Sequence, residues 1–517
     1  MRNKFLPFLL LLAILPVLLF RDYTPSNELR YLSIVDEAFR NGDFFTFTNH
    51  GLLYADKPPL YFWIIMLGKW LLGSHAMWFL SLFSFIPALV IIVVMDKWVG
   101  RELPDTNRLS AQLMLMSCGL FLGMAVVLRM DMLMCMFIVL SLYTFYQMLR
   151  GQGSRGWNSF LFPFYVFMAV FSKGPVGLLV PLVSTLVFLL ITGRIKTVGI
   201  YWGWKTWGIL LIGCAAWFGG VCWEEGGTEY LYNLLFHQTV GRAVDSFDHS
   251  NPFYYYLISV WYSLAPWSVL LIGVIIVAAC RRLVRSDLER FFMVVIITTL
   301  AMLSCFSAKL QIYLAPAFPF FVYLGMLLLT HFRWNRWLAL AVAIPAALFL
   351  LAIPAIIVLS GMKETAFLGQ PLFYAAAGVL TACACTTFCF LYRKKALNKA
   401  INAMVIGLYF ALFVGGWALP SVNNELGYGV LCEKAMEVSA AKNASGYCVL
   451  GVRRSENMDV YLHKSVQVVT PEEVVNGKYE GAVLMISNKM IKSNEELQKF
   501  VSGKEQTMVG RYSIIML

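Results

Sequence analysis

Charged residues are scarce in this chain. They make up 14% of its 517 residues, whereas 59% are hydrophobic, and the 29 acidic residues are outnumbered by 41 Lys and Arg. An ordinary soluble domain has about a quarter charged residues, so the composition excludes a soluble enzyme. A nucleic-acid-binding protein gathers its basic residues on one solvated face. Here they lie in short clusters between apolar runs, which argues against nucleic acid as a partner.

The sequence also indicates no cysteine framework, and the first apolar run, whose basic start and short core fit a cleaved signal peptide, is expected to be retained instead. Nine of the 11 Cys lie before residue 421, where Cys packs as a small apolar side chain. Cys432 and Cys448 lie in the tail, where they could pair in an oxidising compartment or remain free thiols. No Cys and His spacing indicates a zinc site. No small-x-small cleavage site follows the apolar run 5–20, so a retained membrane helix is predicted there.

Long apolar runs dominate residues 1–420. A helix needs about 20 mostly apolar residues to cross the hydrocarbon core of a bilayer. Thirteen runs are predicted as membrane spans, although several of their ends are approximate. They lie near residues 5–20, 76–95, 109–127, 132–149, 159–171, 175–192, 201–222, 256–279, 291–306, 312–330, 337–359, 372–392 and 402–420.

The distribution of charge supports this count. Residues 1–420 hold 30 Lys and Arg against 18 Asp and Glu, so the whole net charge of +12 lies in the apolar part. With the amino terminus inside, every second loop is richer in Lys and Arg, as cytoplasmic loops are. Examples are the clusters at 281–290 and 393–399. The same topology places residues 21–75, 223–255 and the tail outside.

The tail, residues 421–517, differs in kind, because it holds 11 basic and 11 acidic residues. Apolar stretches at 447–451, 465–469 and 481–486 predict strands. The segments 425–442 and 493–502 predict helices, the first of them directly continuing the last span. We therefore expect an α-helical polytopic membrane protein with about 13 transmembrane helices in residues 1–420, followed by a soluble α/β domain in residues 421–517.

The predicted topology gathers unexpected polar residues at the outer face. Residues 25–39 predict a helix along the membrane surface, with Ser26 or Asn27 as the N-cap and Glu28 and Arg30 in the first turn. Alone, this segment is equally typical of a capped amphipathic helix whose charges lie in water. Next, Tyr54-Ala55-Asp56-Lys57-Pro58-Pro59 places an acid and a base before two rigid prolines. Alone, that segment is equally typical of an interfacial turn.

Three further basic positions reach the same face. Arg129 and Asp131 start the fourth span, Lys173 precedes the sixth, and Lys309 with Tyr313 enters the tenth. Ionisable groups at these depths are costly unless they are paired or used. A single Lys near a helix end often snorkels to water. Several cations gathered at the face where basic residues are otherwise scarce indicate an anionic ligand.

The outer loop 223–255 contains His237, Arg242 and His249. A lone loop His is usually a hydrogen-bonding residue. With Asp56 or Glu28 nearby in space, however, a His and carboxylate pair could hold a divalent cation against phosphate oxygens.

Six motifs in order resemble one known family over residues 25–325. It comprises the integral-membrane glycosyltransferases of the aminoarabinose transferase and protein mannosyltransferase type, which have the C-type fold. The motifs are Asn27-Glu28-Leu29-Arg30-Tyr31, Tyr54 to Pro59, Arg129-Met130-Asp131, Ser172-Lys173-Gly174-Pro175, His237 with Arg242, His249 and Pro252 to Tyr256, and Ser304 to Pro316 with Lys309 and Tyr313.

The resemblance implies transfer of a pentosyl or hexosyl group from a polyprenyl-phosphate donor to an acceptor outside the membrane. The implied location is the periplasmic face of a bacterial inner membrane, and the leading candidate for the acceptor is a lipid such as lipid A. A protein O-glycosyltransferase is the second reading. A transporter or flippase of lipid-linked substrates is the alternative from another class. That class predicts polar groups near the midplane and often a repeated half, neither of which the sequence has.

The resemblance also implies residue roles. Lys57, Arg242 and Lys309 would stabilise the charge that builds on the departing phosphate. Asp56 would act in catalysis and, with His249, hold a divalent metal ion. The other substrate-binding candidates are Arg30, Tyr54, Arg129, Lys173 and Tyr313.

One position departs from the family pattern. Asn27 stands where the family has an acid, and an amide cannot take up a proton at neutral pH. Three explanations remain open. Either Asp56, Glu28 or Asp131 acts as the general base, or the acceptor is already ionised, as a phosphate group is, or the family activity has been lost. The second explanation favours a lipid phosphate over a Ser or Thr hydroxyl.

Overall fold

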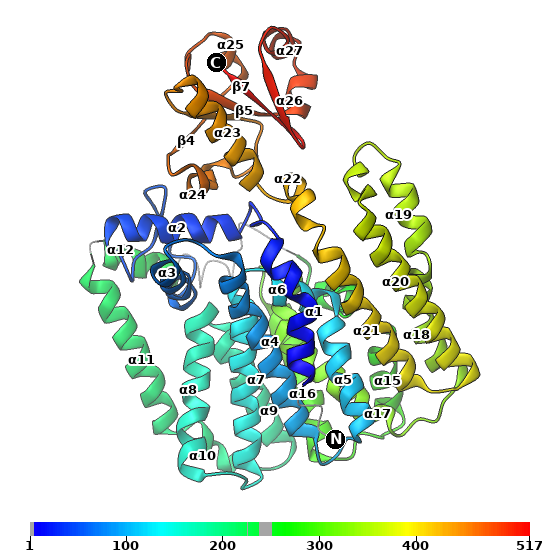
Figure 1. Ribbon diagram of the computed structural model, residues 1–517. Helices are drawn as coiled ribbons and strands as arrows, with labels where there is room; N and C mark the ends of the chain where they lie inside the picture. The colour runs from blue at the N-terminus through cyan, green and yellow to red at the C-terminus, as the bar shows by residue number, and fades with distance from the viewer. Residues whose placement is uncertain (1–4, 225, 237–250) are drawn as a thin grey trace.

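A computed structural model describes residues 5–224, 226–236 and 251–517 of the chain. It consists of a helical bundle with the carboxyl-terminal tail seated on one end (Figure 1). Helix α2 (Glu28–Asn41) lies across that end of the bundle, beneath the tail, and α1 (Leu6–Phe20) starts at the opposite end. The sequence between α2 and α3 (Leu60–Leu72) contains a short hairpin of β1 (Thr48–Asn49) and β2 (Leu52–Leu53).

Helices occupy all the ranges predicted as spans. Besides α1, single helices are α4 (Met77–Val99), α7 (Met130–Leu149), α8 (Arg155–Lys173), α9 (Val176–Ile191), α11 (Trp204–Trp223), α16 (Asp287–Cys305), α17 (Phe318–Leu329), α20 (Pro371–Phe388) and α21 (Leu397–Gly416). Three ranges hold helix pairs, which are α5 (Asp105–Ser117) with α6 (Gly119–Val126), α14 (Tyr255–Ser263) with α15 (Ser268–Cys280), and α18 (Arg336–Leu350) with α19 (Ala352–Ser360).

By length and composition, seven helices of the described ranges can cross a membrane, or eight if the α5 and α6 pair, bent by 67°, counts as one span. The polytopic membrane architecture is therefore confirmed, whereas the count of thirteen stays a prediction. Several of the other expected spans are shorter apolar helices, such as α1 and α9.

The centre of the bundle is formed by helices that are apolar on every side. All residues of α17 are buried, and α7 packs against α4 and α8. Trp98 of α4 contacts five aromatic rings, which belong to Tyr143, Tyr146, Phe291, Phe292 and Phe320. Helix α19, by contrast, has no buried residue. An apolar helix with this exposure fits contact with lipid chains rather than water.

The surface helix α2 begins after Asn27 and ends at Gly42, whose φ of 81° breaks the helix. These limits agree with the prediction. However, every residue from Glu28 to Ala38 except the half-buried Arg30 is buried, and these include the acidic Glu28, Asp36 and Glu37, so the reading of a helix with its charges in water is wrong. The reason is the tail, because α24 (Asp459–Leu462) packs on α2 and Ser33 Oγ donates a hydrogen bond of 3.0 Å to Asp459.

The other side of α2 is anchored to the segment around α3. The Asp36 carboxylate accepts a hydrogen bond of 2.5 Å from Lys69 and lies 2.5 Å from His75 Nε2. Burial alone would raise the pKa of Asp36, but the contacts with His75 and Lys69 hold that pKa below its usual value. Helix α2 is thus fixed between the bundle and the tail.

The tail contains a five-stranded mixed sheet. Its strands are β3 (Tyr447–Leu450), β4 (Val466–Val468), β5 (Val483–Ser487), β6 (Gln506–Val509) and β7 (Tyr512–Met516), in the order β4-β3-β5-β7-β6. Strand β3 is parallel to β4 and β5, and β7 is antiparallel to β5 and β6. The helices around the sheet include α23 (Gly429–Lys442), α25 (Pro471–Val475), α26 (Asn488–Ser493) and α27 (Glu495–Ser502). Cys432 and Cys448 are buried free thiols, which settles the alternative left open by the sequence.

The expected helix over 425–442 does not continue directly from the last span. Instead, α22 (Asn423–Leu426) ends at an extended Gly427, and α23 starts two residues later. The cause is Asp22, whose carboxylate accepts hydrogen bonds from the Gly429 N–H at 2.8 Å and from Tyr461 at 2.5 Å. A Cβ at position 427 would lie 2.1 Å from Asp22 Oδ2, so a larger residue there would displace the Asp22 side chain from its hydrogen bonds.

Candidate active site

Glu28 joins the start of α2 to the bundle. Arg21 donates two hydrogen bonds of 2.7 Å to the Glu28 carboxylate, and the backbone N–H groups of Thr24 and Leu128 donate two more at 2.6 Å. Glu28 is 0% exposed. Because both oxygens already accept hydrogen bonds, this geometry favours a structural role for Glu28 over the role of general base. Arg21 was missed by sequence reasoning, although its position directly after an apolar run was a usable signal.

The first turn of α2 lies close to two of the other motifs. Burial raises the pKa of Tyr31 to about 12, and the positive charge of Arg129 opposes the shift. The charges of Asp131, Arg30 and Asp56 also act on the Tyr31 hydroxyl. Coulombic effects of this kind are strong only at short range. The hydrogen bond of 2.6 Å from the Leu128 N–H to Glu28, and the Tyr31 ring centroid 6.1 Å from that of Tyr61, bring the first three motifs together in one region.

Asn27 occupies the N-cap of α2, but its side chain makes no capping hydrogen bond. Its backbone carbonyl accepts from the N–H of Tyr31 at 3.1 Å. Arg30 bends back, and its guanidinium donates to the carbonyl of Ser26 at 2.9 Å. The family's acidic position is thus filled here by a neutral amide at the end of a helix.

Asp131 is the centre of a buried charge cluster. Its carboxylate forms an ion pair with Lys173, and Arg129 Nε lies 3.1 Å from its other oxygen. Asp131 is 1% exposed. The Lys173 ammonium also lies 4.5 Å from the centroid of the Tyr313 ring, a cation–π contact. Two cations share one carboxylate, so the cluster carries a net positive charge at the end of the apolar bundle.

Local backbone geometry places Lys173 in this cluster. Helix α8 ends at Lys173, and Gly174 has a φ of 105°, which a residue with a side chain rarely adopts. Helix α9 then begins at once after Pro175, the N-cap. The Ser-Lys-Gly-Pro motif is therefore a tight connection that fixes the lysine between two helices.

A cavity of about 400 Å³ lies next to the cluster. Asp56, Lys57, Lys173 and Tyr313 contribute its polar groups. Much of the remaining wall is apolar and includes Leu178, Leu179, Trp217, Phe218, Leu234 and Phe306. Ligand sites combine an apolar wall with a few convergent polar groups. This cavity suits an amphiphile with an anionic group and a hydrocarbon chain.

The turn that carries Asp56 and Lys57 is held by backbone contacts. The N–H of Tyr54 donates to the Phe47 carbonyl at 2.7 Å, and the Tyr54 carbonyl accepts from the Tyr230 hydroxyl at 3.2 Å. Tyr230 belongs to α12 (Gly227–Tyr232) and is buried. Glu224 accepts from the N–H groups of residues 44, 45 and 46 at 2.6 to 3.0 Å. No motif pointed to Glu224.

Lys309 lies beside the cavity rather than on its lining. Lys309 is 4% exposed, and its ammonium donates to the Asn251 carbonyl at 2.8 Å, while the neighbouring Ala308 lines the cavity. Arg242 and His249 lie outside the described residues. The expected convergence of these three residues with Asp56 therefore stays a prediction.

The metal site also stays a prediction. Within 5–224, 226–236 and 251–517, no group of three or more His, Cys, Asp or Glu side chains is placed to hold a metal ion. Asp56 offers the oxygen ligand that hard divalent cations prefer. Its expected partner, His249, lies in the segment that is not described.

Comparison with known proteins shows what this arrangement is similar to. The family described as dolichyl-phosphate-mannose-protein mannosyltransferase matches residues 56–218. A relative from Sodalis glossinidius, named undecaprenyl phosphate-alpha-4-amino-4-deoxy-L-arabinose arabinosyl transferase 2, is 27% identical over 58% of this chain and 54% of its own length. A similarly named transferase from Pectobacterium carotovorum is 25% identical over 75% of this chain and 71% of its own length. Over part of its length, the chain is thus similar to the aminoarabinose transferases and to the protein mannosyltransferase family.

The fold is similar to that of a solved structure. The crystal structure of ArnT from Cupriavidus metallidurans bound to undecaprenyl phosphate covers 99% of this chain and 97% of its own, with a TM-score of 0.76 and 17% sequence identity. At that identity, the match shows a shared fold. The aligned part of this chain spans about half the length of the Sodalis relative. Asp56, Lys57, Asp131 and Lys173 fall inside the range that matches the mannosyltransferase family, whereas Asn27 and Lys309 lie outside it.

The charge cluster makes a test of stability possible. Replacing Asp131→Asn leaves Lys173 and Arg129 with no counter-ion at a nearly buried site, which we expect to cost about 3 kcal/mol of unfolding free energy. Lys173→Met in the Asp131→Asn background should recover part of that loss, giving a coupling energy of about 1 to 3 kcal/mol. Thermal unfolding in detergent of the wild type, Asp131→Asn, Lys173→Met and the double variant measures this coupling energy.

The exposed pair Lys434 and Glu437 supplies the control, because its two side chains are 44% and 56% exposed. Single and double neutral substitutions of this pair should give a coupling energy of less than about 0.5 kcal/mol. Additive losses at Asp131 and Lys173 would show that the buried cluster is not a coupled unit.

Proposed function

We propose that this protein transfers a sugar from a polyprenyl-phosphate donor to an acceptor at the periplasmic face of a bacterial inner membrane. The leading candidate for the acceptor is a lipid such as lipid A. The observation that carries the proposal is the cavity next to the Asp131 cluster. Cationic side chains line it beside an apolar wall, as a phosphate on a prenyl chain requires. The names of the relatives from Sodalis and Pectobacterium, which specify undecaprenyl phosphate and arabinosyl transfer, support the same chemistry.

In the proposed reaction, the bond between the sugar C1 and the donor phosphate oxygen breaks, and a bond from C1 to an acceptor oxygen forms. The electron pair of the broken bond remains on the polyprenyl phosphate. Negative charge therefore grows on that phosphate, and cations aimed at it stabilise the transition state more than the ground state. Lys57 and Lys173 line the cavity, which supports this role for both. Arg242 and Lys309 are further candidates.

Asp131 acts on this chemistry through Lys173. In the ion pair, it holds the lysine ammonium in place, and because Arg129 shares the same carboxylate, the cluster keeps positive charge for a phosphate. Arg30, Tyr54 and Tyr313 complete the proposed substrate-binding set. A divalent cation held by Asp56 and His249 would add charge neutralisation at the donor phosphate.

The acceptor proposal depends on Asn27. A phosphate acceptor is ionised at neutral pH and gives up no proton. The reaction then needs no general base, so an amide at the family's acidic position does not slow it. A hydroxyl acceptor would require a base, for which Asp56 remains the candidate that lines the cavity. This reasoning favours a lipid phosphate. The match of residues 56–218 to a protein mannosyltransferase family keeps protein O-glycosylation as the second candidate.

The proposal includes a topology of thirteen spans. The amino terminus would be cytoplasmic, and the loops 21–75 and 223–255 would lie in the periplasm with the α/β domain of residues 421–517. The concentration of Lys and Arg in alternate loops supports this orientation. Helix α2 and the tail lie at the same end of the bundle, as Figure 1 shows.

Mass spectrometry of envelope lipids and glycoproteins tests the function in cells with and without the gene. We expect a sugar to be missing from a lipid phosphate when the gene is deleted. Lys57→Ala should restore transfer poorly, with kcat/KM lowered on the order of 100-fold, because it removes a charge that acts in the transition state. Lys464→Ala, an exposed lysine of the tail, should restore it fully.

The alternatives give different results in the same experiment. Unchanged lipids with altered glycopeptides would favour the protein acceptor. Loss of uptake of a lipid-linked substrate with no glycan change would favour a transporter and overturn the transferase.

Asn27→Asp tests the acceptor argument. If the acceptor is an ionised phosphate, the added carboxylate repels it, so we expect KM for the acceptor to rise several-fold while KM for the donor stays the same. Asn27→Ser keeps the residue neutral and serves as the matched control. An unchanged acceptor KM and rate in Asn27→Asp would remove support for an ionised acceptor.

Two serine to cysteine substitutions on exposed positions test the topology. Ser502 lies in the tail, and Ser154 lies at the start of α8, at the other end of the bundle. With the outer membrane permeabilised, a membrane-impermeant maleimide should label Ser502→Cys above the wild-type background but should label Ser154→Cys only after lysis. The opposite pattern would invert the proposed orientation.

A further inference from the structure

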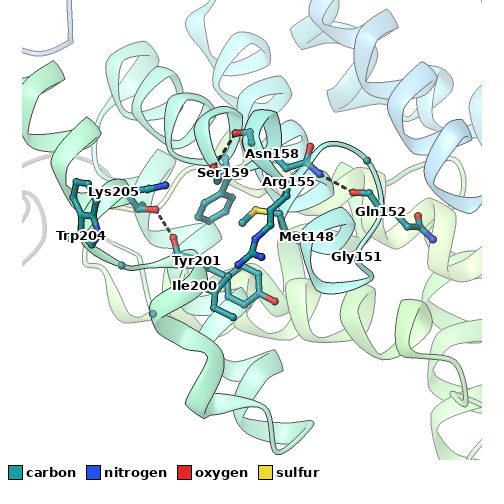
Figure 2. Close-up of a pocket in the computed structure, with 16 residues that line it drawn as sticks. Met148, Gly151, Gln152, Arg155, Asn158, Ser159, Ile200, Tyr201, Trp204 and Lys205 are labelled. Carbon is teal, nitrogen blue, oxygen red and sulfur yellow. Dashed lines mark hydrogen bonds between the residues drawn. The ribbon is translucent and has the colours of Figure 1, made fainter.

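A second cavity lies at the end of the bundle opposite to α2. Its volume is about 830 Å³. It opens between the connection from α7 to α8, the first turn of α8, and the segment of α10 (Val198–Tyr201) and α11 (Figure 2). It shares no lining residue with the cavity beside Asp131. The proposed sugar transfer therefore leaves this cavity without a role.

The lining of this second cavity is basic and contains no acidic residue. Figure 2 shows Arg155 of α8 and Lys205 of α11 with their charged ends directed toward the middle of the cavity from different helices. Both side chains are exposed, and no ion pair of either is found among the described residues. Two unneutralised cations thus face the same space.

An adjoining cavity of about 410 Å³ extends the positive region. It shares Gln152 and Tyr201 with the first cavity and adds Arg150 and Arg194. Asp287 lies 3.3 Å from Arg194 and 4.0 Å from both Arg150 and Arg290. One carboxylate therefore faces three guanidinium groups, and a positive excess remains.

Backbone dipoles add to the positive potential. The first turns of α8 and α11 both line the cavity. The N-cap of α8, Ser154, makes no side-chain capping hydrogen bond, and the N-cap of α11, Gly203, has no side chain to make one. The amide N–H groups of a first helical turn carry partial positive charge and attract anions. The dipoles reinforce the two side-chain cations rather than forming a site by themselves.

Exposed tryptophans mark the level of this cavity in the membrane. Trp157 is 66% exposed and Trp204, which lines the cavity, is 81% exposed. Tryptophan is enriched at the boundary between lipid and water. The long apolar helices α7 and α11 end and begin here. The cavity therefore lies at headgroup depth in the leaflet opposite to α2.

We propose that this cavity binds the anionic phosphodiester headgroup of a membrane phospholipid, with Arg155 and Lys205 contacting the phosphate oxygens. The shared chemistry is a phosphate group between a guanidinium and an ammonium. A lipid is favoured over free phosphate because the cavity lies beside interfacial tryptophans, which leaves the acyl chains of the ligand in the bilayer. Basic pockets between membrane helices are suited to such headgroups.

Lipid binding by the purified full-length protein tests the proposal. Dioleoylphosphatidylglycerol is added to the protein in a neutral detergent, and the bound fraction is read by native mass spectrometry. Each of Arg155→Gln and Lys205→Gln should weaken binding about fivefold, since each removes one charge near the headgroup. The double variant should weaken it about 25-fold. Lys196→Gln, an exposed lysine nearby that does not line the cavity, should change binding less than twofold.

Two further arms separate the sources of phosphate. Dioleoylphosphatidylcholine should bind weakly and equally to all variants, because its headgroup has no net charge. Inorganic phosphate at 10-fold excess over the lipid, as an order-of-magnitude choice, should not displace phosphatidylglycerol if the acyl chains contribute. Displacement by inorganic phosphate, or equal phosphatidylglycerol binding by wild type and the double variant, would overturn the proposal. Arg155→Lys keeps the charge and should restore binding.

Discussion

The cost of placing charge in an apolar bundle constrains this structure most. Asp131 is almost fully buried, and it is tolerated there because Lys173 and Arg129 both contact it. A buried carboxylate with no partner would cost several kcal/mol. The partners come from the end of α8 and from the residue before α7. The same ion pairs that make the carboxylate tolerable therefore fix the helices that line the adjacent cavity.

Helix α2 extends this constraint to the tail. It is buried on both sides, with Asp36 bound to Lys69 and His75 below and Ser33 bound to Asp459 above. Its first turn is bound close to the start of α7, because the Glu28 carboxylate accepts a hydrogen bond of 2.6 Å from the backbone N–H of Leu128. A displacement of the tail would thus reach the proposed acceptor side of the site through one rigid helix rather than through a flexible loop.

Much of this structure could be predicted from the sequence, because the membrane imposes simple rules. Apolar length located the helices, and short apolar stretches in the tail located β3, β4 and β5. The hairpin of β6 and β7 was missed. Gln506, Thr507 and Met508 of β6 are exposed, so this strand lacks the run of buried apolar residues that would indicate it. The motifs identified the polar residues of the cavity, but its apolar wall, including Trp217 and Phe218, resembles any other span. Neither Arg21 nor Glu224 belongs to a motif, so their contacts appear only in three dimensions.

The contact between the two ends of the membrane part has a consequence for biosynthesis. Helix α1 packs on α21, and Asp22 is bound by the backbone at Gly429. The ribosome makes these partners about 400 residues apart, which at 5 to 20 residues per second separates them by roughly 20 to 80 seconds. During that interval, α1 has to remain in the lipid without its final neighbour. Helix α1 can remain in lipid during this interval, because every residue from Leu6 to Phe20 is apolar and none needs a polar partner before α21 is made.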